Sequence, residues 1–342
     1  MLLNLTAVAL PWLIAGFVLT GAVILLAGTQ LARQADRIAD RTGMGEALTG
    51  AVFLGATTSL PGSILSVVAA SFGHTGLAIS NAIGGIAAQT AFLGVADIAY
   101  RRANLEHAAA SLTNLTQAAL LLVLLAIPLI AASTPPIALL GISPATVALL
   151  ATYGLGIRLS VAARCEPMWR PQDTVETARD VPDANAGWHG WRSWVMFACV
   201  ATCTALAGFL LAEFAVELSR KTGLSESKIG AIFTAVTTSL PELVTSIAAV
   251  RQGALTLAVG GIIGGNAFDV LFLAFADIAY RDGSIYHAMV ERHVFLLALS
   301  IAMTGVLLLG LLRRETHGIA GIGFESALVL AMYLGAVVVV MS

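Results

Sequence analysis

Two stretches of this sequence decide its fold, because each carries the same proline-interrupted motif: GAVFLGATTSLPG at residues 50–62 and GAIFTAVTTSLPE at residues 230–242. The similarity extends outward from both. Residues 41–107 align with residues 221–287 without a gap, at a constant shift of 180, and roughly 29 of the 67 positions are identical. Shared hydrophobicity alone would give far fewer identities, so the chain contains an internal repeat.

The composition places this repeat in a membrane. The chain has 342 residues, of which 58% are hydrophobic and 11% are charged, and its formal net charge is -2. A soluble domain carries roughly 25% charged residues. The composition therefore excludes an ordinary cytosolic enzyme and a disordered protein, and the charge balance gives no sign of a nucleic-acid partner. It predicts an all-α, polytopic protein of the lipid bilayer.

Apolar runs of about 20 residues, long enough to cross the hydrocarbon core, predict about ten transmembrane helices. They lie near residues 6–30, 45–71, 77–100, 111–132, 136–157, 193–218, 226–250, 254–280, 288–312 and 320–341. The polar stretch 158–192 predicts a linker. It divides the chain into two five-helix halves, 1–157 and 193–342, with the repeat at about 40–107 in the first and about 220–287 in the second.

Five spans in each half is an odd number, so the two repeats must have opposite orientations in the membrane. Loop charges support this arrangement and set its direction. About 13 of the Lys and Arg residues fall on the side of the linker and about five on the other side. The bias predicts a cytoplasmic linker with both chain termini outside. Scarce lysine beside abundant arginine and alanine favours a GC-rich bacterial source, so the expected location is a bacterial plasma membrane. Inverted repeats are typical of secondary transporters, whose sites lie at the repeat interface near mid-membrane.

Both TTSLP segments interrupt an apolar helix with a proline, Pro61 or Pro241. Proline lacks an N–H and clashes with the carbonyl four residues earlier, so the carbonyls of Thr57 and Thr237 lose their helical partners. Such carbonyls are costly in hydrocarbon unless they line a cavity or coordinate something. One such segment could be a kinked helix whose hydroxyls repair its own backbone. Two such segments, related by the internal repeat, favour an ion-binding site.

The second repeat adds acidic side chains to this set of oxygen-bearing residues. Glu242 follows directly after Pro241, and a carboxylate at membrane depth predicts a functional site. Asn266 and Asp269 share one face of the next span, whose glycines, Gly260–Gly261 and Gly264–Gly265, have the small-xxx-small spacing of closely packed helices. Carboxylate, amide and hydroxyl oxygens suit a hard cation such as Ca²⁺ or Na⁺.

These motifs resemble the α-repeats of the cation/Ca²⁺ exchanger superfamily, the sodium/calcium exchangers and their relatives. The resemblance covers about residues 40–107 and 220–287, and it implies ten helices in two inverted repeats, alternating access, and cation ligands at matching positions. The first repeat departs from the family pattern: Gly62 replaces the expected glutamate, Gly85-Ile86 replaces Ser-Asn, and Gln89 replaces the common Asn. The candidate metal ligands are Glu242, Asp269, Thr238, Ser239, Asn266, Thr58, Ser59, Gln89, Thr237 and Thr57.

The departures reduce the charge of the site to two carboxylates. Two can balance one Ca²⁺ or two Na⁺, but a third monovalent ion stays uncompensated in a low dielectric. The sequence therefore predicts an antiporter, not an enzyme, that exchanges Ca²⁺ or a similar divalent cation for Na⁺ or H⁺ without any cofactor. Gly62 keeps an alternative open, a transport-impaired relative that serves as a membrane scaffold or cation sensor. Motifs of an intramembrane enzyme are not found.

Two further acids lie at membrane depth. Asp97 and Asp277 each stand four residues before an arginine, Arg101 or Arg281, which is the spacing of a helical ion pair. We expect structural pairing there, with a proton relay as the alternative.

Overall fold

The computed structural model describes residues 5–100, 102–138, 141–165, 167, 169–177, 190–221, 234–318 and 322–341. These residues are mainly helical, and no strand occurs among them. Seven of their helices are long and apolar enough to cross a membrane, or eight when one bent pair is taken as a single span. The all-α, polytopic class predicted from the sequence is therefore confirmed.

The helices follow one another without intervening sheet. Their bounds are α1 Leu10–Thr42, α2 Glu46–Thr49, η1 Gly50–Gly55, α3 Ala56–Thr58, α4 Leu60–Ser71, α5 Thr75–Ala99, α6 Leu105–Ala108, α7 Leu112–Ala132, α8 Pro144–Cys165, α9 Trp191–Lys221, α11 Ala235–Thr238, α12 Leu240–Gln252, α13 Leu255–Asp269, α14 Leu271–Ala279, α15 Glu291–Arg313 and α16 Phe324–Met341.

Each of the ten predicted spans coincides with a helix or broken helix, but the boundaries differ most at α1 and α8. α1 continues to Thr42, well beyond the predicted end at residue 30. α8 continues to Cys165, so the predicted linker 158–192 begins too early, and it starts at Pro144 and not near residue 136. Proline is well suited to a first helical turn because its missing N–H would have no partner there. Residues 226–233, the N-terminal part of the predicted span 226–250, lie outside the described residues.

The two TTSLP motifs form helix breaks. In the first repeat, the helix from Glu46 to Thr58 and α4 meet at Ser59 with a bend of 46°. In the second, α11 and α12 are separated by Ser239. Pro61 and Pro241 stand in the first turn of α4 and α12, as expected for a residue without an N–H. A π-helical stretch, η1, lies just before the first break, a feature often found at functional sites.

Glycines bring the first broken helix against α13. A Cβ atom on Gly50 would lie 2.6 Å from the carbonyl oxygen of Leu257, and one on Gly264 would lie 2.2 Å from the Cα atom of Ala51. Neither position has room for a side chain. This close approach is what the small-residue spacing predicts.

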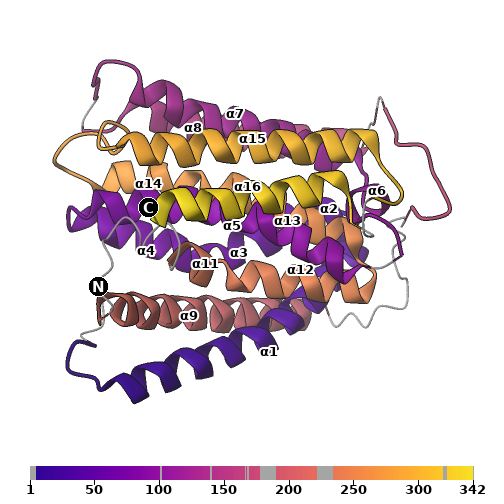
Figure 1. Ribbon diagram of the computed structural model, residues 1–342. Coiled ribbons are helices and arrows are strands. Elements are labelled where there is room, and N and C mark those ends of the chain that lie inside the picture. Colours follow the sequence, from indigo (N-terminus) through magenta and orange to yellow (C-terminus); the bar gives the residue numbers. More distant parts are fainter. Residues whose placement is uncertain are drawn as a thin grey trace.

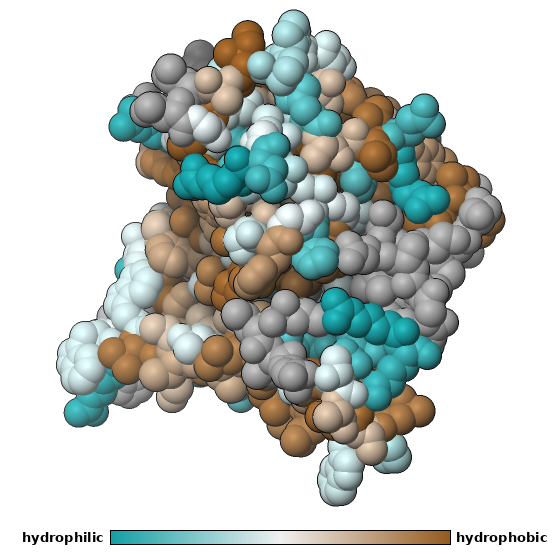
Figure 2. All heavy atoms as spheres, turned by 90° about the vertical axis from the view of Figure 1, so that its left-hand side faces the viewer, coloured by the Kyte–Doolittle hydropathy of each residue, from teal (hydrophilic) through white to brown (hydrophobic). Residues whose placement is uncertain are grey.

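The breaks lie inside the bundle, while α1 and α9 lie side by side along one edge (Figure 1). Within the most apolar part of each span, α5 is 83% buried and α13–α14 is 94% buried, against 17% for α1. Seen from the end that carries the N-terminus, hydrophilic residues gather on parts of the end face, and hydrophobic residues lie between them and on parts of the outline (Figure 2). This distribution suits a bundle that spans a bilayer.

Candidate cation site

Glu242 lies in the first turn of α12, immediately after the second helix break, and its side chain is 2% exposed. Its Oε1 atom accepts a hydrogen bond of 3.1 Å from the hydroxyl of Ser59, which lies at the first break. Its Oε2 atom has no hydrogen-bond partner among the described residues. One residue of each TTSLP motif therefore takes part in the same contact.

Asp269 ends α13 and is also buried. Its Oδ2 atom accepts a hydrogen bond of 2.5 Å from Nε2 of Gln89 on α5, while Oδ1 lacks a partner among the described residues. Nε2 of Gln89 also donates to the hydroxyl of Ser239, at 3.1 Å. Ser59, the partner of Glu242, and Gln89, the partner of Asp269, both lie within 3.8 Å of where a Cβ atom on Gly265 would stand, so the two carboxylates share one environment.

Two glycines lie beside this polar cluster. A Cβ atom on Gly85 would lie 3.6 Å from both Oδ2 of Asp269 and Oγ of Ser239. One on Gly265 would lie 3.4 Å from Oε1 of Gln89 and 3.8 Å from Oγ of Ser59. Gly85 and Gly265 are equivalent in the two repeats. The site is therefore built by repeat-related residues, with glycine leaving space beside the oxygens.

Asn266 and Asn81 extend the cluster. Nδ2 of Asn266 donates to the hydroxyl of Thr90 at 2.9 Å, and its Oδ1 atom has no partner among the described residues. Nδ2 of Asn81 donates to the carbonyl of Gly62 at 3.1 Å, and its Oδ1 atom accepts from Thr238 at 3.4 Å. Neither Asn81 nor Thr90 is among the site residues predicted from the sequence. An amide side chain within the otherwise apolar span 77–100 was the signal that could have identified Asn81.

The threonines of the motifs mostly bond their own helices. The hydroxyl of Thr58 donates to the carbonyl of Leu54 at 2.9 Å, and that of Thr238 donates to the carbonyl of Thr234 at 2.7 Å. Thr57 does the same with Phe53, at 2.6 Å. These hydroxyls thus do what a kinked helix requires. Their oxygens keep acceptor capacity while they donate. Thr237 is buried in the same segment.

The position of the missing glutamate is filled. A Cβ atom on Gly62 would lie 2.8 Å from Cε2 of Phe272, whose side chain is buried. Glu242 holds the equivalent position in the second repeat. The described residues contain no group of three or more His, Cys, Asp or Glu side chains arranged to hold a metal ion. The two acids at this site therefore have no third acid beside them in the described part of the chain.

Asp97 and Asp277 lie outside this cluster and bind loop backbone. Asp277 accepts from the N–H groups of Ser143 and Ile285, at 2.8 and 3.1 Å, and not from Arg281 as the ion-pair spacing predicted. Backbone donors meet it because two loops fold over the end of α14. The other predicted partner, Arg101, lies outside the described residues.

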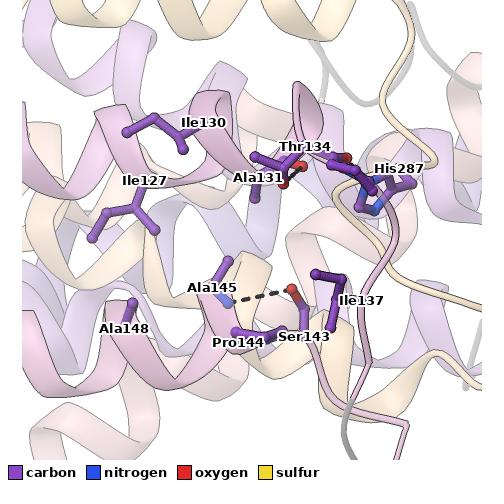
Figure 3. A pocket seen from close by; sticks show the side chains of 11 residues that line it. Ile127, Ile130, Ala131, Thr134, Ile137, Ser143, Pro144, Ala145, Ala148 and His287 are labelled. Carbon is purple, nitrogen blue, oxygen red and sulfur yellow. Dashed lines mark hydrogen bonds between the residues drawn. The ribbon is translucent and has the colours of Figure 1, made fainter.

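A cavity of about 400 Å³ lies elsewhere, between the end of α7 and the start of α8 (Figure 3). Ile127, Ile130, Ala148 and other apolar side chains make up most of its lining, with His287 at its edge. No carboxylate lines it. Without a carboxylate the cavity has no negative charge to balance a hard cation, so the candidate cation site remains the cluster around Glu242 and Asp269.

The sodium/calcium exchanger protein family matches residues 12–160 and 192–342, which is most of the chain. The chain belongs to the sodium/calcium exchanger family. The resemblance inferred from the repeats is thereby confirmed, and so is the expectation of a membrane transporter and not an enzyme. As a member of this family the chain is an integral membrane protein.

Individual proteins of known name are also similar to this chain, in sequence over short stretches and in structure over nearly its whole length. The sodium/calcium exchanger MaX1 of Methanosarcina acetivorans is 33% identical over 88 residues, 25% of each chain. The inner membrane protein YrbG of Escherichia coli is 37% identical over 76 residues, 22% of this chain and 23% of that protein. These alignments thus span about a quarter of each relative. A structure of the sodium-calcium exchanger NCX_Mj matches 96% of this chain and 99% of its own, with a TM-score of 0.69 and 20% identity, which shows a common fold.

Proposed function

We propose that this exchanger transports Ca²⁺, or a similar divalent cation, in exchange for Na⁺ or H⁺. The observation that carries the proposal is the pair of buried carboxylates, Glu242 and Asp269, each with one oxygen unpartnered among the described residues. Buried charges need a partner, and a hard cation ligated by oxygen is the partner that suits them. Sodium/calcium exchange is also the activity in the names of MaX1 and NCX_Mj.

Each ligand would contribute in a particular way. Glu242 and Asp269 would supply the negative charge. Ser59, Ser239, Asn266 and Gln89 would supply neutral oxygens, and so would the oxygens of Thr57, Thr58, Thr237 and Thr238. Because Ser59, Ser239 and the threonines lie at or next to the helix breaks, small rotations of the helix segments would open one side of the site and close the other.

Alternating access would come from α1 and α9. These helices pack chiefly on each other, and α1 also packs on α12. A pair packed together at the edge of the bundle can slide as a unit over the remaining helices. An empty site would cross slowly because its two carboxylates would be exposed to a low dielectric without a counter-ion. Movement would therefore require a bound cation, and this requirement couples the two fluxes.

The membrane arrangement proposed with this function is two inverted five-helix halves, 1–157 and 193–342, joined by a cytoplasmic linker. Both termini would face outside, in a bacterial plasma membrane. Alkaline phosphatase, which is active only outside the cytoplasm, tests this when fused to the C-terminus. High activity is expected there and low activity at a fusion within residues 170–177. The reverse pattern would contradict the orientation.

Transport itself is tested by uptake of radiolabelled Ca²⁺ into proteoliposomes under an imposed Na⁺ gradient or an imposed pH gradient. The gradient that drives uptake identifies the coupling ion. Glu242→Gln and Asp269→Asn should each abolish uptake, because either change removes half of the site's charge. Glu291→Gln, an exposed acid in the first turn of α15, is the matched control and should transport normally. Undiminished uptake by both site variants would refute the assignment.

The absence of an acid at Gly62 keeps a second function under consideration, that of a transport-impaired cation sensor or membrane scaffold. Titration calorimetry with Ca²⁺ separates the possibilities when it is combined with the uptake measurement. Binding together with uptake supports the antiporter. Binding without uptake in any gradient supports a sensor, and a protein that neither binds nor transports would be a scaffold.

A further inference from the structure

The first repeat offers no negative charge where the second repeat offers two. The counterpart of Glu242 is Gly62, and the counterpart of Asp269 is Gln89. At Gly62 the space for a side chain is taken by the ring of Phe272, 2.8 Å from where a Cβ atom would lie. An acid could enter this position only if that buried ring moved.

At the other position, an amide stands where the second repeat has a carboxylate. Gln89 contacts its own counterpart in the other repeat: its Nε2 atom donates to Asp269 at 2.5 Å and to Ser239 at 3.1 Å. The amide is neutral and fully buried, so it satisfies part of Asp269 without balancing its charge. Its Oε1 atom has no partner among the described residues and can serve as a neutral ligand.

The site thus has two carboxylates, Glu242 and Asp269. The first repeat adds none, because the ring of Phe272 takes the space beside Gly62 and because Gln89 is a neutral amide. In a low-dielectric interior, two carboxylates balance one divalent cation or two monovalent cations, and a third monovalent cation would remain uncompensated. This sets how many ions can occupy the site in each half of the transport cycle.

We propose that the exchanger moves one divalent cation against two monovalent cations, so that no net charge crosses the membrane, and that Gln89 is a specificity-determining residue of this balance. The proposal rests on the proposed antiport function. It holds for Na⁺, for H⁺, or for one of each, because all of these carry the same total charge.

The experiment is uptake of radiolabelled Ca²⁺ by the full chain in proteoliposomes whose membrane potential is set with K⁺ and valinomycin. Moving one net charge through a potential of about 100 mV changes the equilibrium accumulation about 50-fold. Under a fixed Na⁺ or pH gradient, the accumulation by this protein should not change with potential. A shift of that size would overturn the inference while leaving the antiport function intact.

Substitution of Gln89 tests its assignment. Gln89→Asp places an acid at the counterpart of Asp269, and the third carboxylate should admit a third Na⁺. Accumulation should then become potential-dependent by about 50-fold. Gln89→Asn keeps a neutral amide and is the matched control: its uptake should be slower because a ligand is altered, but its equilibrium accumulation should stay independent of potential. If both variants behaved alike, Gln89 would not set the charge balance.

Equilibrium binding gives a readout that needs neither transport nor a variant. Na⁺ should displace Ca²⁺ from the detergent-solubilised protein with a Hill coefficient of no more than two, since the site has charge for two Na⁺ ions only. A coefficient near three would overturn the inference. Complete lack of uptake in every gradient would instead overturn the proposed function, and with it any exchange ratio.

Discussion

Asp97 and Asp277 occupy equivalent positions in the two repeats, and each binds the backbone N–H of the residue eight positions later. The N–H of Leu105 donates to Asp97 at 2.7 Å, and that of Ile285 donates to Asp277 at 3.1 Å. A second backbone donor comes from a distant loop in each case, Gly323 for Asp97 and Ser143 for Asp277. The two aspartates therefore stabilise loops at opposite ends of the bundle through hydrogen bonds. They do not belong to the cation site.

Asp277→Asn should lower thermal stability and leave cation binding unchanged. The substitution keeps the shape of the side chain but removes the charge that strengthens its bonds to Ser143, Thr146 and Ile285. Hydrogen bonds to a charged group contribute about 1.5–3 kcal/mol each, so a loss of that order is expected in the free energy of unfolding. Melting of the detergent-solubilised protein and Ca²⁺ calorimetry measure the two effects. A loss of transport with full stability would instead favour the proton-relay alternative.

The loop at the Asp97 end carries a buried acid, Glu106, where the other end has Tyr286. Burial raises the pKa of the Glu106 carboxyl well above its usual range, and the charges of Asp97 and Glu325 raise it further. Its proton is therefore bound more tightly in the folded than in the unfolded state. The stabilisation is complete below the usual pKa of glutamate, about 4.3, and is lost as the pH rises through the pKa of the folded state.

The melting temperature should consequently fall as the pH is raised above the usual pKa of glutamate. Glu106→Gln should remove most of this fall. The glutamine keeps the neutral form that the buried position favours. Glu291→Gln, in an exposed position, is the control and should keep the slope of the unsubstituted protein. If the Glu106→Gln protein showed the same pH dependence as this control, the titrating group would lie elsewhere.

Much of the fold could be predicted because its causes are local. The length of each apolar run predicts a membrane-spanning helix, and an odd number of spans in each repeat predicts that the two repeats have opposite orientations. The start of α8 could not be placed in this way, because hydropathy averages over the apolar residues before Pro144 and does not register that the helix begins only there. The partners of Asp277 could not be found either, because Ser143 lies far away in the chain.

The same limit applies to the site. The sequence indicates which residues carry oxygen and charge, and the structure brings Ser59, Ser239, Gln89, Glu242 and Asp269 together. Their role as ligands remains a proposal. The ring that fills the space beside Gly62 had no signal in the sequence, because it depends on the tertiary contact between α4 and α14.

The contact between η1 and α13 predicts opposite effects for two glycine substitutions. Gly264→Ala would place a Cβ atom 2.2 Å from Cα and Cβ of Ala51, so the helices would have to separate. Overpacking of this kind costs about 1–3 kcal/mol. Gly305→Ala on α15 meets no atom within 4 Å and should stabilise by about 0.5–1 kcal/mol, because alanine is the better helix former. Equal melting temperatures for the two variants would contradict the close approach.

Restoring the missing glutamate alone should fail. Gly62→Glu forces its Cβ atom against Phe272, so we expect a loss of about 1–3 kcal/mol of stability and no additional Ca²⁺ affinity. The double variant Gly62→Glu with Phe272→Ala makes room for the carboxylate and should bind Ca²⁺ more tightly than Phe272→Ala alone. Calorimetry of the four proteins forms a complete cycle. A gain in affinity from Gly62→Glu by itself would show that the ring does not exclude an acid.

Gly208 on α9 offers a test of the sliding movement. A Cβ atom at this position would lie 2.6 Å from Cγ of Pro61 and 3.6 Å from Cγ of Pro241, so α9 passes directly over both helix breaks. Gly208→Ala should therefore obstruct movement without touching the carboxylates. We expect at least about a tenfold slower turnover, which corresponds to about 1.4 kcal/mol in the barrier, with little change in Ca²⁺ affinity. Gly21→Ala on α1, which meets no atom within 4 Å, is the matched control. Equal loss of affinity and turnover in Gly208→Ala would mean that α9 shapes the site and does not slide over it.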